Sequence, residues 1–190
     1  MNFDALSIPR HSWLRPGLAL GDSPLEGKGV YTMEAIPEGA TVIVWGGIVV
    51  TYDEFATGRG LAHSNVGLTE ELCLVAPNEE GLTLDDYMNH SCNPNLWLSG
   101  SVTLIARRAI QPGEELTFDY AIEVGHESYV MKVPCRCGAN DCRGQITGKD
   151  WRLGHVQEKY EGHFSPFIEA RIRALVGAAG PLDIQTGGHQ

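Results

Sequence analysis

The sequence NHSCNPN at residues 89–95 decides the fold prediction for this chain. Two further stretches follow it: GEELTFDY at residues 113–120, and a group of three cysteines within residues 135–142. Taken alone, the first stretch indicates only a polar turn, because serine and an Asn-Pro step are common in loops. The three stretches in this order combine an amide, an imidazole, a phenol and several thiols. We therefore expect a site assembled from distant parts of the chain.

The composition is that of one globular domain. The chain has 190 residues, of which 43% are apolar, and it can bury a core of its own. Its longest apolar run, residues 41–50, is shorter than the about 20 residues that span a bilayer. The N-terminus also lacks the basic, apolar and small-residue order of a signal peptide. These features predict a soluble, intracellular protein with no membrane partner.

The net charge of −10 argues against direct binding of nucleic acid, which requires clustered Lys and Arg. A basic partner fits this charge better. Residues 51–86 hold eight acidic residues and a single arginine, which gives this segment a charge of −7. Two interpretations stay open: a solvated acidic face, or an electrostatic guide for a Lys/Arg-rich substrate.

The cysteine spacing predicts a metal site. Five cysteines in an intracellular chain are more often thiols or metal ligands than disulfides. Cys135, Cys137 and Cys142 lie within eight residues, and Cys92 is the natural fourth ligand of a tetrahedral zinc. Such a zinc is structural, because four thiolates leave no open position for water. Free thiols and a Cys-x-Cys redox pair are the alternatives. Cys73, between two leucines, is expected in the core.

Short strands and few helices are predicted along the chain. The capping box of Thr51 and Glu54 starts a helix over 52–57, Asp150 caps a helix through 160, and Ser165-Pro166 starts a helix that ends near Gly177. The predicted strands are 30–33, 41–44, 71–75, one within 101–110, and one through Leu116 and Phe118.

In this order, the three stretches resemble the SET-domain protein lysine methyltransferases that carry a cysteine-rich post-SET segment. The resemblance implies a β-rich α+β fold of short strands in small sheets, in which the segment with Asn89 passes under the loop with Tyr120 as a pseudoknot. It also implies a post-SET segment followed by helices. The expected organisation is an extended lead-in over 1–24, the SET domain over 25–123 with a variable acidic insert at 51–86, the zinc segment over 131–147, a helical annex over 148–178 and a disordered tail over 179–190.

The resemblance implies S-adenosylmethionine as the cofactor. Gly27-Lys28-Gly29 alone is only a glycine turn, and Thr32 in place of a third glycine excludes a dinucleotide fingerprint. In the family, such a Gly-x-Gly lets the main chain approach the methionine part of the cofactor. The cofactor-binding residues implied by the resemblance are Lys28, Gly29, Val30, Tyr31, Asn89, His90 and Tyr120. The family's zinc ligands match Cys92, Cys135, Cys137 and Cys142.

The expected reaction is methyl transfer to a lysine amine, with Tyr120 as the catalytic residue. Because the reference pKa of lysine is about 10.4, a neutral amine near pH 7 costs about 4 to 5 kcal/mol unless the site lowers that pKa. Tyr120 is expected to orient the amine rather than to act as a strong base. Trp45, Phe118 and Tyr120 are the expected substrate-binding residues. Phe118 leaves room for di- or trimethylation, whereas Trp45 stands where the family usually has a tyrosine.

Several alternatives remain at this stage. Tyr120 could be an ordinary core tyrosine, and Cys92 could be a nucleophile assisted by His90. The chain could also be a SET-fold module that binds a basic peptide or partner without turnover, or a zinc-stabilised interaction domain without cofactor. The expected partner of the enzyme is a Lys/Arg-rich protein or peptide such as a histone tail. No cysteine-dense segment precedes Gly27, so the pre-SET zinc module of many histone enzymes is absent from this sequence.

Overall fold

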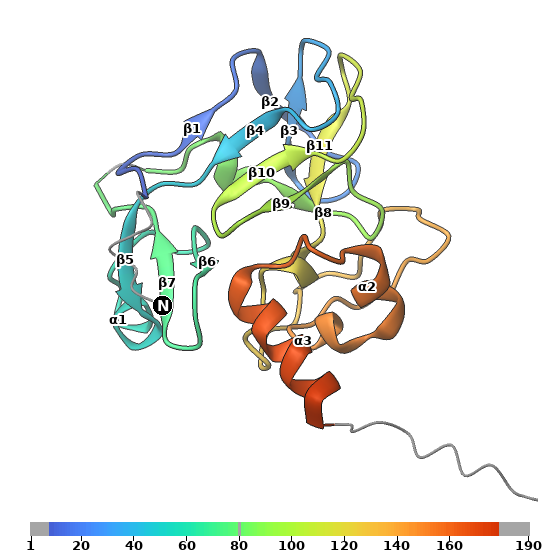
Figure 1. Ribbon diagram of the computed structural model, residues 1–190. Helices are drawn as coiled ribbons and strands as arrows, with labels where there is room; N and C mark the ends of the chain where they lie inside the picture. The colour runs from blue at the N-terminus through green and yellow to red at the C-terminus, as the bar shows by residue number, and fades with distance from the viewer. Residues whose placement is uncertain (1–7, 80, 179–190) are drawn as a thin grey trace, which may run out of the picture.

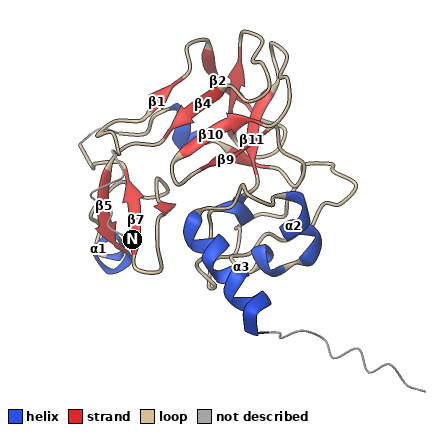
Figure 2. Cartoon of the chain, in the orientation of Figure 1, coloured by secondary structure: helices blue, strands red, loops and turns tan. Residues whose placement is uncertain are grey.

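The computed structural model describes residues 8–79 and 81–178, with side chains up to residue 175 (Figure 1). The tail predicted to be disordered, 179–190, and residues 1–7 lie outside the described residues. Short strands dominate, as predicted (Figure 2). The strands are β1 (Trp13–Leu14), β2 (Leu18–Asp22), β3 (Lys28–Thr32), β4 (Thr41–Val44), β5 (Ile48–Thr51), β6 (Val66–Gly67), β7 (Leu72–Val75), β8 (Asn89–His90), β9 (Leu96–Ser99), β10 (Thr103–Ala106) and β11 (Glu115–Phe118).

Three small sheets form the body of the domain. Their strand orders are β1-β4-β10-β9, β2-β3-β11-β8 and β5-β7-β6. The central strand β4 is the β-branched run TVIV, and its Val42 and Ile43 are fully buried against Leu98 and Leu104 of the same core. β-branched residues suit such a pleated, buried surface, which explains why this run forms a central strand.

Strands β8 and β11 pair in parallel, which brings the NHSCNPN stretch beside GEELTFDY. Thr117 lies opposite Asn89, and the Ser91 amide donates to the Phe118 carbonyl at 3.1 Å. The buried Asn95 side chain then continues this ladder. Its amide donates to the Glu115 carbonyl at 2.8 Å and its oxygen accepts from the Thr117 amide at 2.9 Å. Both ends of the decisive stretch are therefore bound to one strand.

The acidic insert adds β6 and β7 to β5 in a small sheet at one side of the molecule (Figure 1). It contains α1 (Tyr52–Ala56) and the 3-10 helix η2 (Leu84–Tyr87) beside strands β6 and β7. The predicted capping box is confirmed: Thr51 Oγ1 accepts from the Glu54 amide at 3.1 Å, and Glu54 Oε2 accepts from the Thr51 amide at 2.9 Å. Cys73 is fully buried, as predicted.

The C-terminal helices pack together below the sheets (Figure 2). Their buried side chains include Trp151, Tyr160 and Ile168, which join the main core. The elements are η3 (Tyr120–Ile122), η4 (Asp150–Arg152), α2 (Gly154–Lys159) and α3 (Pro166–Ala178).

The structure corrects three expectations about local structure. The lead-in is not merely extended, because β1 pairs with β4 and β2 pairs with β3. Asp150 does not cap one helix through 160, because the helical structure is interrupted at Leu153, between η4 and α2. Asp150 is instead the first residue of η4, and its carboxylate binds Arg143 and Thr147. Ser165 does not cap α3 through its hydroxyl, which is buried without a hydrogen-bond partner among the described residues. Helix α3 does begin at Pro166.

Candidate active site

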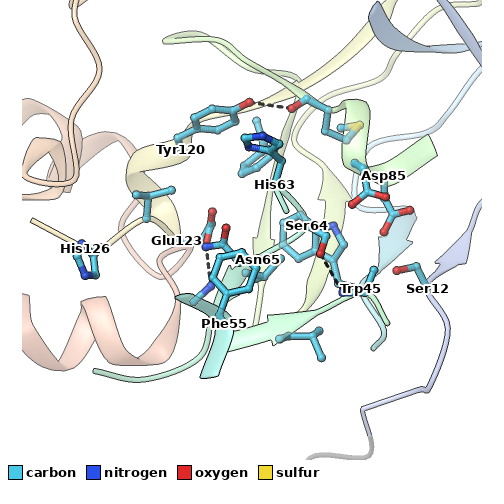
Figure 3. A pocket seen from close by; sticks show the side chains of 18 of the residues that line it. Ser12, Trp45, Phe55, His63, Ser64, Asn65, Asp85, Tyr120, Glu123 and His126 are labelled. Atoms are coloured by element: carbon cyan, nitrogen blue, oxygen red, sulfur yellow. Dashed lines mark hydrogen bonds between the residues drawn. The ribbon is translucent and has the colours of Figure 1, made fainter. Parts of the chain in front are cut away.

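A cavity of about 710 Å³ lies between the acidic insert and the end of β11 (Figure 3). All three residues predicted to bind the substrate, Trp45, Phe118 and Tyr120, line this cavity. Trp45 and Phe118 meet edge to face with ring centroids 5.5 Å apart, and the Phe118 and Tyr120 rings are 5.1 Å apart. Tyr129 adds a further ring 6.5 Å from Tyr120. The cavity therefore has an aromatic wall that suits an alkyl chain.

Tyr120 is held at both ends of the residue. Its hydroxyl donates to the Met88 carbonyl at 3.0 Å, and its backbone amide donates to His90 Nδ1 at 3.2 Å. Burial raises the pKa of the phenol, so Tyr120 stays protonated near neutral pH. It is thus a positioned hydrogen-bonding group rather than a ready base.

Residues 88–90 separate two faces of the site. Met88 lines the cavity, whereas Asn89 and His90 line a second depression on the other side. Burial lowers the pKa of His90 to about 4, so the ring is neutral. Its Nδ1 accepts from Tyr120, so we place the ring proton on Nε2, 3.3 Å from Cys92 Sγ. Tyr120 thus touches the residues of both faces.

The second depression has the chemistry of a cofactor site but little space. It joins apolar Leu25, Met131 and Val133 to the ionic side chains of Glu26 and Arg136. An amino acid zwitterion attached to an aromatic base would find partners in this set, so the residues fit S-adenosylmethionine chemically. The open volume is only about 10 Å³, and five of the nine lining residues belong to residues 131–136. Entry of such a ligand requires this lining to open.

Only part of the predicted cofactor set meets at this depression. Asn89 and His90 line it, whereas the other predicted residues do not. Val30 is fully buried in the core, Lys28 pairs with Asp22 at 2.6 Å, and the Tyr31 hydroxyl donates to the Asp22 carbonyl. A Cβ at Gly29 would lie 2.2 Å from the Glu115 carboxylate, so a larger residue here would require the Glu115 side chain to shift.

The four predicted zinc ligands converge. The sulfur atoms of Cys92, Cys135, Cys137 and Cys142 all lie within 4.8 Å of one another. Zinc about 2.3 Å from each sulfur holds tetrahedral thiolates about 3.8 Å apart, so the cluster fits this ion. The backbone amide of Cys92 donates to the Cys137 sulfur and that of Arg143 donates to the Cys92 sulfur, both at 3.4 Å. The cluster ties the 131–147 segment to the decisive stretch.

A buried ionic network that the motifs did not reveal lies behind Tyr120. Arg143 donates two hydrogen bonds to Asp119 at 2.6 and 2.7 Å and one to Asp150 at 2.7 Å. The Tyr160 hydroxyl donates to Asp119 at 3.0 Å. Side chains of all three charged residues are at most 8% exposed. The network joins the residue before Tyr120 to the cysteine segment and to α2. Its only sequence signal is an arginine next to Cys142.

Glu123 is the second residue that the sequence did not identify. It lies in the cavity wall, one turn after Tyr120, and is 5% exposed. Its Oε2 accepts from the Gly67 amide at 2.9 Å. Burial raises the pKa of this carboxyl to about 7. No motif covers this position, so only the fold shows that the residue faces the site.

The structure divides the acidic residues of the insert into two groups. Glu54 pairs with Arg59 and Glu70 pairs with Arg171, and these carboxylates stabilise the surface rather than the site. Asp85 and Asp86 line the cavity, where burial raises the pKa of Asp86. The first group fits the interpretation as a surface face, and for the second group the electrostatic guide stays a prediction.

Comparisons with known proteins identify the family. A family model for the SET domain matches residues 27–121, which is half of the chain, and the chain belongs to this family. It is 34% identical over 161 residues to the histone-lysine N-methyltransferase ash1 of Drosophila melanogaster, a match that covers 77% of this chain and 7% of ash1. It is 33% identical over 141 residues to the histone-lysine N-methyltransferase of Mycosarcoma maydis described as H3 lysine-4 specific, covering 66% of this chain and 9% of that protein. The chain thus spans less than a tenth of the length of these two relatives.

Solved structures support the same fold. The methyltransferase domain of human SETMAR aligns with a TM-score of 0.53 at 23% identity, over 69% of this chain and 58% of that one. KRYPTONITE, solved in complex with mCHG DNA and SAH, aligns with a TM-score of 0.53 at 28% identity, over 70% of this chain and 29% of that one. The predicted SET-domain fold is therefore confirmed. Among the described residues, no helix has the length and apolar character needed to cross a membrane.

Proposed function

We propose that this chain is a protein lysine N-methyltransferase that uses S-adenosylmethionine and acts on a lysine in a basic protein segment. One observation carries the proposal. The phenol of Tyr120 lies at an aromatic cavity lined by Met88, and the next two residues, Asn89 and His90, line the second depression. A lysine side chain entering from one face and a methyl donor bound at the other would meet beside Tyr120.

The aromatic wall prepares the amine. Trp45 and Phe118 are about 95% buried, so a lysine side chain lying against them loses most of its hydration. Desolvation disfavours the ammonium and lowers the lysine pKa, which favours the neutral amine that attack requires. The Tyr120 hydroxyl already donates its hydrogen to the Met88 carbonyl, so both oxygens are left as acceptors for the N–H groups of this amine and can orient its lone pair.

The depression would hold the cofactor. Glu26 and Arg136 can bind its ammonium and carboxylate, Asn89 adds an amide, and Met131 and Val133 offer apolar contact. When bound, S-adenosylmethionine supplies a methyl group on a positively charged sulfur. The four-cysteine cluster would hold a structural zinc, whose binding energy offsets the entropy of ordering residues 131–147. Because the cluster includes Cys92, it would fix this segment directly beside His90.

The substrate is proposed to be a Lys/Arg-rich segment, with histones as the first candidates. None of the described residues that line the cavity is Lys or Arg, whereas Asp85, Asp86 and Glu123 line it. A basic segment is therefore electrostatically matched to this cavity. The relatives named above are histone-lysine methyltransferases, which supports the same choice. Phe118 places no hydroxyl at its own position beside Tyr120, which favours products beyond monomethyl-lysine.

A transfer assay tests the proposal. The chain is incubated with methyl-labelled S-adenosylmethionine and core histones. A parallel reaction uses a cell extract in place of the histones. Mass spectrometry then locates the modified residue. We expect the label on lysine, and its loss in Tyr120→Phe. Label on another residue type, or tight binding of basic peptides without any transfer, would contradict the proposal; the second result would indicate a non-catalytic binding module.

A further inference from the structure

Glu123 places a carboxylate in the cavity wall, although the hydrogen bond that it makes there does not require a negative charge. The residue is 5% exposed, yet it belongs to the lining of the cavity that contains Tyr120 (Figure 3). One carboxylate oxygen accepts from the Gly67 amide at 2.9 Å. The other oxygen has no hydrogen-bond partner among the described residues. A glutamine could accept the same bond from Gly67 without placing a carboxylate in the wall.

No Lys or Arg of the described residues compensates Glu123. The described residues that line the cavity include the carboxylates of Asp85 and Asp86 and the imidazoles of His63 and His126, but no Lys or Arg. Arg171 lies near this part of the chain, yet its guanidinium binds Glu70 and the Gly125 carbonyl instead. A carboxylate buried without a cation costs free energy, and the raised pKa of Glu123 reflects this cost. A cationic ligand would remove it.

The site of Glu123 is separate from the site of the target amine. Tyr120 Oη is hydrogen-bonded to the carbonyl of Met88, the residue just before β8, whereas Glu123 Oε2 is hydrogen-bonded to the amide of Gly67 in the acidic insert. Both groups open into one cavity. A peptide lying across this cavity would therefore meet two polar groups, a phenol and a carboxylate, at different points along its length.

We propose that Glu123 is a specificity-determining residue that binds a second basic side chain of the substrate, an arginine or lysine close in sequence to the target lysine. This inference rests on the proposed function, and it narrows the substrate class to segments with paired basic residues. A guanidinium or ammonium would donate to the open carboxylate oxygen, and charge-assisted hydrogen bonds of this kind are stronger than neutral ones. The Gly67 amide holds the carboxylate in place, so little side-chain order is lost when the ligand binds.

Peptides that differ only in one charge test the proposal. Each peptide carries one central lysine. The three positions before this lysine and the three after it are filled in turn with arginine or with citrulline. Citrulline is a neutral residue whose shape is similar to that of arginine. For wild type we expect one flanking position at which arginine gives about tenfold higher kcat/KM than citrulline. In Glu123→Gln the ratio at that position should fall to about one. Asp85→Asn, which removes a charge from a partly exposed position in the same cavity, should keep the preference at that position.

Direct binding separates this inference from the methyltransfer itself. Calorimetry on the same peptides, with the central lysine replaced by norleucine, should show the tenfold arginine preference in wild type and its loss in Glu123→Gln. This result supports the inference even if no transfer is found, in which case only the proposed function fails. Two results would overturn the inference. One is a wild type without a flanking preference. The other is a Glu123→Gln variant that binds the arginine and citrulline peptides equally more weakly than wild type, while its thermal unfolding matches wild type.

Discussion

The two walls of the cavity are held in different ways. On one side, the crossing of residues 89–95 with β11 is fixed by main-chain pairing, by the Asn95 side chain and by the buried ion pairs of Asp119. On the other side, the acidic insert folds as its own small sheet and meets the C-terminal half of the chain through side-chain contacts such as Gly67 with Glu123 and Glu70 with Arg171 (Figure 1).

This difference separates chemistry from recognition. The crossing positions Tyr120, and a small shift of a reacting group can cost about 100-fold in rate. A rigid, buried arrangement is therefore suited to this region. The insert offers carboxylates to a substrate and can change its side chains without disturbing the crossing. We expect substitutions in the crossing to affect turnover and folding strongly, and substitutions toward the insert to affect substrate binding more weakly.

The broadest effect, on metal content, folding and activity together, is expected from loss of the proposed zinc. Wild type should contain about one zinc per chain, and Cys137→Ser should lose it, because a tetrahedral structural site needs all four ligands. Folding free energy is coupled to such sites, so we expect residues 131–147 to become exchange-labile and activity to fall at least tenfold. Elemental analysis and hydrogen exchange measure these changes. Cys73→Ala, outside the cluster, should keep the metal; equal zinc content in all three proteins would contradict the assignment.

Tyr120→Phe should lower kcat by about 100- to 1,000-fold while the affinity for S-adenosylmethionine changes less than threefold. The substitution keeps the ring contacts with Phe118 and removes only the hydroxyl that orients the amine. Stopped-time methylation assays and calorimetry measure the two quantities. Tyr129→Phe removes a hydroxyl from the same cavity and should cost less than fivefold. Similar losses in both variants would mean that Tyr120 has no special role.

The ionic network of the crossing should be the next most sensitive feature. Arg143→Ala leaves Asp119 and Asp150 buried without their cation, and breaking a buried pair in this way costs about 3 to 5 kcal/mol. Urea unfolding should report a decrease of that size. Arg108→Ala removes an exposed partner of Glu114 and should cost less than about 1 kcal/mol. Equal destabilisation would show that burial of the network contributes nothing.

Glu123→Gln should stabilise the chain, in a pH-dependent way. Burial raises the carboxyl pKa from its ordinary value of 4.5 to about 7, so the folded state binds a proton that the unfolded chain releases. The ionised Glu123 therefore lowers the free energy of unfolding above pH 7 by up to about 3 kcal/mol. This destabilisation disappears below pH 4.5. Thermal unfolding at pH 8 and pH 5 should show a larger gain for the variant at pH 8. A gain that is equal at both pH values would contradict this account of Glu123.

The smallest effect is expected where the insert meets α3. Arg171→Ala removes the ion pair with Glu70 and the hydrogen bond to the Gly125 carbonyl. Since Glu70 is well exposed, stability should change by less than about 1 kcal/mol. KM for a basic peptide should rise about threefold with kcat within twofold, because only the recognition wall loosens. Arg173→Ala, two residues further along α3 and paired with Glu169, should leave both constants unchanged.

The sequence predicted the crossing better than the insert, for a physical reason. Residues whose chemistry demands a fixed spacing form recognisable motifs, and the structure brings the cysteines together and places Trp45, Phe118 and Tyr120 at one cavity. Glu123 carries no such signal. Its burial depends on the docking of the insert, which is a tertiary contact between segments 56 residues apart.

Local signals failed where a tertiary contact outweighed them. Asp150 has good capping chemistry, but Arg143 and Thr147 occupy its carboxylate, so the predicted helix breaks. The sequence predicted only an extended lead-in and missed the pairing of β1 and β2, because strands from elsewhere in the chain supply their hydrogen bonds. The cofactor roles of Lys28 to Tyr31, the domain boundaries and the extent of methylation remain predictions.

The most direct test of the two-faced site is a crystal structure with S-adenosylhomocysteine and a lysine peptide bound together. The account predicts the lysine amine within hydrogen-bonding distance of Tyr120 Oη in the aromatic cavity. It predicts the cofactor product beyond residues 88–90, against Asn89 and His90, with residues 131–136 displaced outward. Both ligands on one side of residues 88–90, or a lysine that lies outside the cavity, would contradict it.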